Sequence, residues 1–193
     1  GYSGNRDLDA EKSNTLEIYS NLDLNEDLKL STRAFRSNIK NNIEYINNKY
    51  RNDNDDIALN QSGLNSTLSY KNKDFNFNLF GSFLSSKKEN GASQLRRPQK
   101  NFGANFTKDI ENSFVGNFKV NLKYKYYGKH FDTHSSTFST IEMDSREIID
   151  LKLSKKIENT DFYFKITNLL DDHYQKPHGY NQEGRVIKLG FKY

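Results

Sequence analysis

The side chains best suited to chemistry include all four histidines, which lie in two stretches of the chain. His130, Asp132 and His134 form an H-x-D-x-H pattern, and His173 and His178 follow further along. Imidazole nitrogens and carboxylate oxygens at this spacing can bind a divalent metal ion. Histidines in solvated loops give the same pattern, and we favour that interpretation. We therefore predict no metal site and no cofactor.

A second group of candidate ligands is acidic. Asp53, Asp55 and Asp56 lie close together, as they do in calcium-binding loops. Such a loop needs a glycine at its sixth position and a glutamate at its twelfth, and both are missing here. We therefore expect a solvated loop.

The chain carries no common enzyme motif. It contains no G-x-S-x-G, H-E-x-x-H or G-x-x-x-x-G-K-S/T pattern and no cysteine, so we expect it not to be an enzyme. Its 29 basic and 25 acidic residues are interspersed and leave a net charge of +4. A nucleic-acid-binding protein would gather basic residues into a block, so this class is not favoured.

The elements that must position these residues are β-strands, because apolar residues recur at every second position. In one stretch the apolar positions are Phe118, Val120, Leu122, Tyr124 and Tyr126, alternating with Lys119, Asn121, Lys123 and Lys125. This period is typical of a strand with one apolar face. The sequence predicts about nine strands, at residues 14–22, 28–40, 57–71, 75–86, 100–108, 115–128, 147–156, 161–169 and 185–193. No segment is predicted to be helical, and no apolar run approaches the roughly 18 residues of a membrane-spanning helix.

The alternation changes phase at two places. One change falls at Phe35, and the other separates Ile57 and Leu59 from Leu64. We predict a β-bulge at each, because an extra residue in one strand shifts the following side chains to the other face.

The predicted connections alternate strictly between short and long. The short ones are residues 23–27, 72–74, 109–114 and 157–160, and the long ones are 41–56, 87–99, 129–146 and 170–184. In an up-and-down sheet, successive connections fall at opposite ends, so one end carries only tight turns. Outer-membrane β-barrels have this asymmetry. A soluble β-sandwich also alternates, and it stays the alternative.

The composition of the two faces favours the barrel. The polar face is mostly Asn, Ser, Thr and Lys, as expected of a wet lumen, and aromatic residues crowd the strand ends, where interfacial girdles lie. The charged residues expected to face the lumen are Glu17, Arg33, Lys119, Lys123 and Lys125.

Three stretches resemble the TonB-dependent outer-membrane transporters. The first runs through Asn168-Leu169-Leu170-Asp171, Tyr174, Gly179-Tyr180 and Gly184-Arg185 into a last alternating segment. This order is similar to the family ending N-L-F-D-x-x-Y, G-Y-x-x-x-G-R and a final strand. Leu170 replaces the usual Phe, and Asn181 and Glu183 stand where Pro is common.

The other two stretches are shorter. Gly4-Asn5, Leu8 and Glu11-Lys12-Ser13 are similar to the family segment G-N-P-x-L-x-P-E-x-S, with Arg6 and Ala10 in place of both prolines. Arg96-Arg97-Pro98 resembles the R-R-P that precedes a downward strand in the family. Together the three stretches cover essentially the whole chain in the family's order.

The resemblance implies a fold and a function. Residues 1–193 would be the C-terminal part of such a receptor: an all-β, antiparallel, up-and-down transmembrane segment of about nine strands from a 22-stranded barrel. The plug domain and the N-terminal strands would be absent. The parent would lie in the bacterial outer membrane, among lipid and lipopolysaccharide, and would import a bulky, scarce nutrient with energy delivered by TonB through the plug.

The nutrient implied by the resemblance is cobalamin or a ferric siderophore. Short outer loops and the G-Y-x-x-x-G-R ending favour cobalamin. A passive porin-like channel is the alternative function, and a soluble β-sandwich binding module is a less favoured one.

The resemblance also gives roles to individual residues. Arg96 and Arg97 would lie at the barrel mouth, where they could hold a ligand carboxylate or phosphate, and Tyr180 could stack on a planar ligand. A rim salt bridge or a lipopolysaccharide contact is the favoured role of the arginines, and loop packing is the alternative role of the tyrosine. Phe191 and Tyr193 would provide the assembly signal of the last strand.

Overall fold

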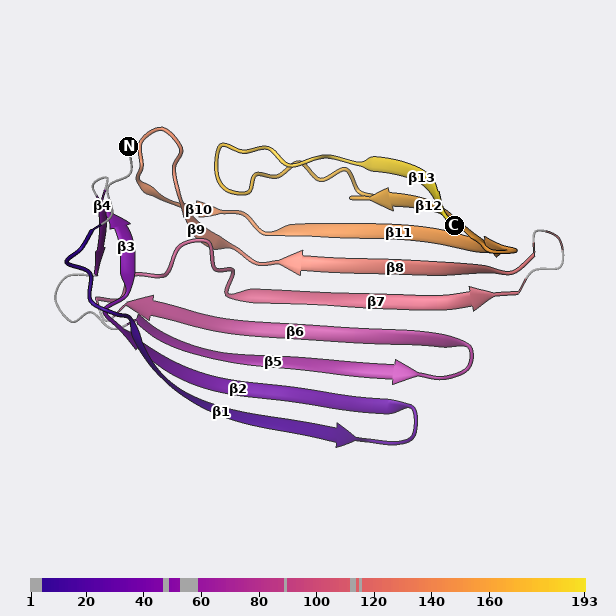
Figure 1. Cartoon of the computed structure of the whole chain (residues 1–193), viewed down its shortest axis with the longest axis horizontal. Coiled ribbons are helices and arrows are strands. Elements are labelled where there is room, and N and C mark those ends of the chain that lie inside the picture. The colour runs from indigo at the N-terminus through magenta and orange to yellow at the C-terminus, as the bar shows by residue number, and fades with distance from the viewer. Residues whose placement is uncertain (1–4, 47–48, 53–58, 89, 112–113, 115) are drawn as a thin grey trace.

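The chain forms one long antiparallel sheet (Figure 1). The computed structural model describes residues 5–46, 49–52, 59–88, 90–111, 114 and 116–193. Within them, the sheet has nine strands: β1 (Lys12–Asp23), β2 (Leu28–Lys40), β5 (Leu59–Lys71), β6 (Phe75–Lys88), β7 (Lys100–Ile110), β8 (Phe118–Tyr127), β11 (Arg146–Ile157), β12 (Thr160–Thr167) and β13 (Val186–Lys192). These residues contain no helix that could cross a membrane.

The nine predicted strands are all confirmed, and each is the neighbour of the next one along the chain. Two short hairpins were not predicted from the sequence. They are β3 (Ile43–Ile46) with β4 (Lys49–Asn52), and β9 (His130–Thr133) with β10 (Thr140–Met143). Both lie inside long connections, where four-residue strands are too short to give a period. Asp53, Asp55 and Asp56, for which we expect a solvated loop, lie outside the described residues.

The connections divide between the two ends of the sheet, as predicted. Figure 1 shows the β1–β2, β5–β6, β7–β8 and β11–β12 turns at one end and the four longer connections at the other. In the β5–β6 turn, the Asn72 Oδ1 accepts hydrogen bonds from the backbone N–H groups of Asp74 and Phe75, at 2.9 Å each. An asparagine that caps its own turn makes a tight connection possible without glycine.

Neither predicted β-bulge occurs within the described residues; Ile57, on which part of the second prediction rests, lies outside them. Residues pair one to one along the whole β1–β2 ladder and the whole β5–β6 ladder, so no extra residue interrupts either. The phase changes because Phe35 and Leu59 place apolar side chains on the otherwise polar face. The Phe35 ring lies over Gly63, where an added Cβ would come within 2.5 Å of it. Leu59 is only 2% exposed, whereas Leu64, on the opposite face, is 42% exposed.

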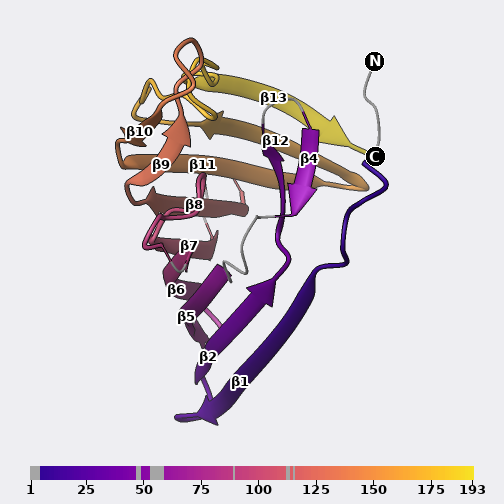
Figure 2. The same ribbon diagram turned by 90° about the vertical axis from the view of Figure 1, so that its left-hand side faces the viewer.

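The sheet is curved, and its two faces differ. In Figure 2 the β3–β4 hairpin lies in the hollow of the curve, and Glu44 in this hairpin pairs with Lys88 of the polar face at 2.7 Å. The polar face is therefore the concave one. On the convex face, large apolar side chains are open to the surroundings, among them Leu16, Ile18, Leu64, Leu79, Phe83, Leu122, Ile187, Leu189 and Phe191.

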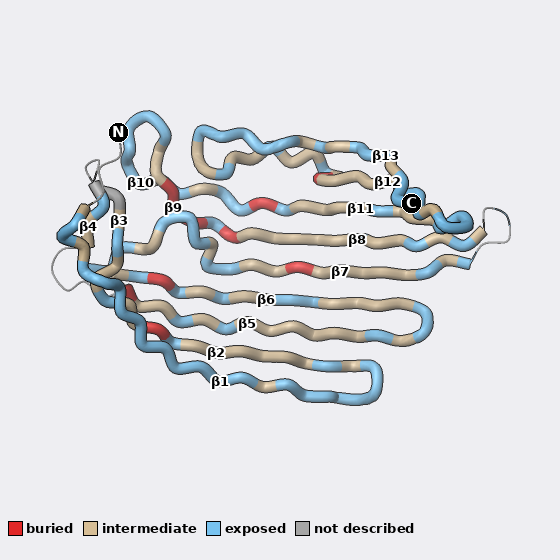
Figure 3. The backbone as a smooth tube through the Cα atoms, in the orientation of Figure 1, coloured by how far each residue is buried: buried red, intermediate tan, exposed pale blue. Residues whose placement is uncertain are grey.

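The sheet has almost no hydrophobic core of its own. Leu59 is the only buried hydrophobic side chain in the described part of the chain, and Figure 3 shows that most of the sheet is intermediate or exposed. A soluble sandwich would cover its apolar face with a second sheet. The nine-stranded sheet described here has no such cover, so the sandwich alternative loses its structural basis.

The division of the connections predicts which ends of the strands face the outside of the cell. In the parent protein, a cysteine at Ser136, in the β9–β10 turn, should react with a membrane-impermeant thiol reagent on intact cells. A cysteine at Lys73, in the β5–β6 turn, should not. Both residues are exposed. Neither side chain makes a hydrogen bond or ion pair within the described residues. The measurement is the labelled fraction of each variant before and after the outer membrane is opened; labelling of Lys73→Cys alone would invert the assignment.

Candidate functional site

Three long connections meet at the carboxylate of Asp132, in β9. Its Oδ1 accepts hydrogen bonds from the Arg96 Nε and the Thr133 backbone N–H, both at 2.7 Å. Its Oδ2 accepts one from the backbone N–H of His178 at 2.9 Å. Arg96 follows β6 and His178 follows β12, so one side chain joins segments that are far apart in the sequence. Asp132 is completely buried, at 0% exposure.

The hydrogen bonds keep Asp132 ionised. Burial acts to raise the pKa of this carboxyl group, but the Arg96 guanidinium and the two amides outweigh it and bring the pKa below its ordinary value. The backbone of Arg96 adopts a left-handed conformation with φ of 62°. In that conformation its N–H donates to the carbonyl oxygen of Phe131 at 2.6 Å, so Arg96 contacts β9 through both backbone and side chain.

A cavity of about 500 Å³ lies beside Asp132 at the long-loop end of the polar face. Among the described residues, three cationic side chains line it, those of Arg96, Arg146 and Lys176, and Asp132 is the only carboxylate. The His130 imidazole also lines it and is 7% exposed. Burial lowers the pKa of His130, and the charge of Arg146 lowers it further, so the imidazole is neutral at pH 7.

Arg146 is held by aromatic rings. Its guanidinium lies 4.5 Å from the ring centre of Tyr127 and 5.0 Å from that of Tyr174. The residue is 6% exposed, and its Nε has no hydrogen-bond partner in the part of the chain that the structure describes. Lys176 also lies over Tyr127, with its Nζ 6.0 Å from the ring centre. Cation–π contacts fix the position of these charges without neutralising them.

The histidine pattern does not form a metal centre in the described residues, which contain no group of three or more His, Cys, Asp or Glu that could hold an ion. The His134 and His178 rings lie 4.5 Å apart. The His178 Nδ1 accepts the Ser135 backbone N–H at 3.0 Å, and the His134 Nδ1 accepts that of Thr137 at 3.1 Å. These histidines therefore connect two outer loops.

Of the three predicted ligand-binding residues, Arg96 lies at the cavity and Arg97 and Tyr180 lie away from it. Arg96 lines the cavity and forms the ion pair with Asp132, which is the rim salt bridge considered above as its favoured role. Arg97 and Tyr180 are exposed and do not line the cavity. A role of these three residues in ligand binding stays a prediction.

The five charged residues assigned to the lumen share the polar face of the sheet. Glu17 pairs with Arg33, Lys119 with Asp109 at 3.5 Å, and Lys125 with Asp150 at 3.9 Å. Lys123 stands opposite Asp150 in the β8–β11 register.

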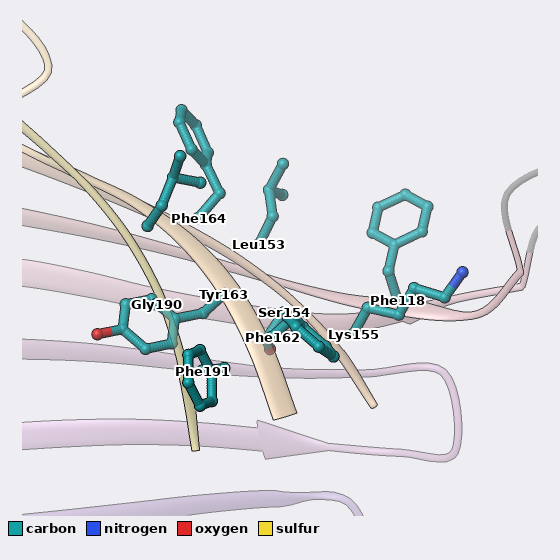
Figure 4. A pocket seen from close by; sticks show the side chains of 10 residues that line it. Phe118, Leu153, Ser154, Lys155, Phe162, Tyr163, Phe164, Gly190 and Phe191 are labelled. Carbon is teal, nitrogen blue, oxygen red and sulfur yellow. The ribbon is translucent and has the colours of Figure 1, made fainter. Parts of the chain in front are cut away.

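A second hollow lies on the apolar face near the short-turn end (Figure 4). It is a groove of about 710 Å³ between β8 and β13, lined mainly by Phe118, Leu153, Phe162, Phe164, Leu189 and Phe191. The Phe162 and Phe191 rings lie 6.2 Å apart. Tyr193 follows β13 and is 91% exposed. The assembly role of Phe191 and Tyr193 stays a prediction.

Arg146, Tyr127 and Lys176 belong to the site but were not predicted from the sequence. A signal was present for one of them. Arg146 continues the polar phase of its strand and stands opposite Tyr127 in the adjacent strand, so it was available as a lumen-facing charge. Lys176 lies in a connection without a period, and nothing in the sequence placed it near the others.

Comparison with known proteins identifies the fold. Residues 1–169 match the family model described as TonB dependent receptor-like, beta-barrel. No curated protein matches the chain.

Solved structures match over nearly the whole chain. The ferric-catecholate import receptor Fiu from E. coli K12 is 20% identical, with a TM-score of 0.76, over 99% of this chain and 29% of its own. The ferripyoverdine receptor of Pseudomonas aeruginosa is 14% identical, with a TM-score of 0.75, over 93% of this chain and 27% of its own. The ferric yersiniabactin uptake receptor FyuA from Yersinia pestis is 17% identical, with a TM-score of 0.72, over 93% of this chain and 28% of its own. The chain thus spans less than a third of each of these proteins.

Asp132 predicts a measurable effect on loop stability. Asp132→Asn removes the charge and replaces one acceptor oxygen with a donor, so at least one of the three hydrogen bonds is lost. A hydrogen bond to a charged group contributes about 1.5–3 kcal/mol. We expect at least one of the Thr133 and His178 amides to exchange at least tenfold faster with deuterium in the purified parent protein, measured by mass spectrometry.

The matched control for this experiment is Asp144→Asn. Asp144 lies in the same connection, and its side chain is 94% exposed, so its surface ion pair with Lys129 contributes little. Equal exchange in Asp132→Asn and the unaltered protein would mean that the carboxylate does not hold the loops together.

Proposed function

Because the chain belongs to the family of TonB-dependent receptor β-barrels, we propose that it forms part of an active importer of a bulky, scarce nutrient. Members of this family are outer-membrane proteins of Gram-negative bacteria, and they are receptors and transporters rather than enzymes. The family implies energy coupling through TonB. Contact of this chain with lipopolysaccharide is part of the proposal.

The observation that carries the proposal is the difference between the two faces of the sheet. Every strand pairs with its neighbours along an antiparallel ladder, and the convex face presents open apolar side chains. Lipid cannot hydrogen-bond to a strand backbone, so a spanning sheet must pair its strands and close into a barrel. The apolar face would contact lipid, and the groove near Phe162 would be filled by acyl chains.

This assignment of faces predicts that the same substitution to lysine has different effects on stability at two adjacent residues. Leu79→Lys places a charge on the apolar face of β6 and should cost about 2–4 kcal/mol if Leu79 lies near the bilayer midplane. Asn78→Lys places the same charge on the polar face and should be nearly neutral. The measurement is the fraction of the parent protein that is folded and heat-modifiable in the outer membrane. Equal loss in both variants would contradict the lipid assignment.

The polar face would line the lumen. Glu17, Arg33, Lys119, Lys123 and Lys125 lie on it together, and four of the five take part in ion pairs across neighbouring strands. Charged pairs of this kind are compatible with a water-filled or plugged interior and would be costly against lipid.

A ferric siderophore is our first candidate for the nutrient, and cobalamin is the second. The titles of the similar structures name ferric-catecholate, ferripyoverdine and ferric yersiniabactin as the cargo of those proteins. Their identity to this chain is low, so they support the siderophore only as a class. The preference for cobalamin rests on the short outer loops and on the C-terminal motif.

The deciding experiment is energised uptake by cells that have the parent gene as their only receptor of this kind. We expect accumulation of a labelled ferric siderophore, loss of accumulation when the proton-motive force is collapsed or TonB is deleted, and no competition by cobalamin. Accumulation of cobalamin instead would reverse the choice of ligand. Uptake that persists without TonB and without the proton-motive force would indicate the passive channel.

A further inference from the structure

We propose that the cavity beside Asp132 binds a carboxylate group of the transported ligand. The inference rests on the proposed function in one respect, namely that the occupant is the imported nutrient. The binding site itself rests on the charges and burial of its lining residues.

The buried guanidinium of Arg146 is the first reason. The residue is only 6% exposed. Its side chain nevertheless makes no hydrogen bond or ion pair within the described residues. A buried charge without a counter-ion is unfavourable, and the faces of Tyr127 and Tyr174 compensate for only part of the lost hydration. A carboxylate would complete the interaction, because it accepts two parallel hydrogen bonds from a guanidinium group.

The excess of positive charge is the second reason. Asp132 is the only carboxylate that the described residues place in the wall. It already accepts hydrogen bonds from Arg96 and two amides. Arg96 uses only its Nε in this pair, and Lys176 has no ion pair in the described part of the chain. The cavity therefore has an excess positive charge that its own wall leaves unbalanced.

The place and size of the cavity agree with a ligand group. The cavity lies at the long-loop end, on the concave face, where a nutrient arriving through the outer loops would first meet the barrel. Its volume of about 500 Å³ is within the range of small-molecule sites. Three loops joined at Asp132 hold its wall, so the cationic groups are positioned before a ligand arrives.

The test uses the purified parent receptor with citrate as the anionic probe and glycerol as an uncharged probe. Isothermal titration calorimetry should detect binding of citrate and no binding of glycerol. Arg146→Gln should weaken citrate binding at least tenfold, because a charge-assisted hydrogen-bonded pair is lost. Lys176 is exposed, so replacing it with glutamine should not disturb folding. Lys176→Gln should weaken citrate binding about threefold to tenfold.

Lys129→Gln is the matched control. It removes one positive charge from the connection that holds His130, but Lys129 pairs with Glu142 at 2.8 Å and does not line the cavity. Citrate binding should change less than twofold in this variant. No citrate binding by the unaltered receptor, or equal weakening in all three variants, would overturn the proposal.

Failure of this proposal can be told apart from failure of the proposed function. The titration needs neither TonB nor a proton-motive force, and the uptake experiment needs neither variant. Energised uptake without an Arg146-dependent effect on citrate binding would remove the carboxylate site alone. Arg146-dependent citrate binding without energised uptake would keep the carboxylate site and remove its role in import.

Discussion

The uninterrupted antiparallel ladder from β1 to β13 is the constraint on which the rest of the structure depends. Side chains of a strand alternate between faces, so one-to-one pairing keeps every apolar position on the same side of all nine strands. A single inserted residue would move the rest of its strand to the wrong face. This explains why Phe35 and Leu59 are accommodated as apolar residues on the polar face, with Gly63 providing room for one of them, rather than by a bulge.

Regular pairing along the strands leaves variation to the connections, and the long connections depend on one another. Asp132 accepts hydrogen bonds from a residue that follows β6 and from one that follows β12, while His134 and His178 contact each other nearby. The loops are thus joined by polar contacts rather than by a hydrophobic core. Because Asp132 is fully buried, its hydrogen bonds are stronger than similar bonds at a surface, and loss of a partner would be correspondingly costly.

The strands could be predicted from the sequence and the contacts of the site could not, and the difference has a physical reason. A period of two is a local property, so β8 could be recognised from Phe118 to Tyr126 without any knowledge of its neighbours. The contact between Arg96 and Asp132 joins residues 36 apart, and no local pattern encodes it. The H-x-D-x-H pattern pointed to the right loop, but it did not predict that the carboxylate of Asp132 holds three connections together.

Cations on the polar face differ in whether a carboxylate lies beside them. Toward the middle of the strands, cations have carboxylates within reach, as Lys125 has Asp150 and Arg33 has Glu17. At the long-loop end, the faces of Tyr127 and Tyr174 are the only partners of the Arg146 side chain within the described residues. A protein that needed this arginine for folding alone would be more stable with a carboxylate beside it, since leaving a buried charge unpaired is among the largest single costs in a structure. An anion that arrives through the outer loops would supply the partner that Arg146 lacks among the described residues.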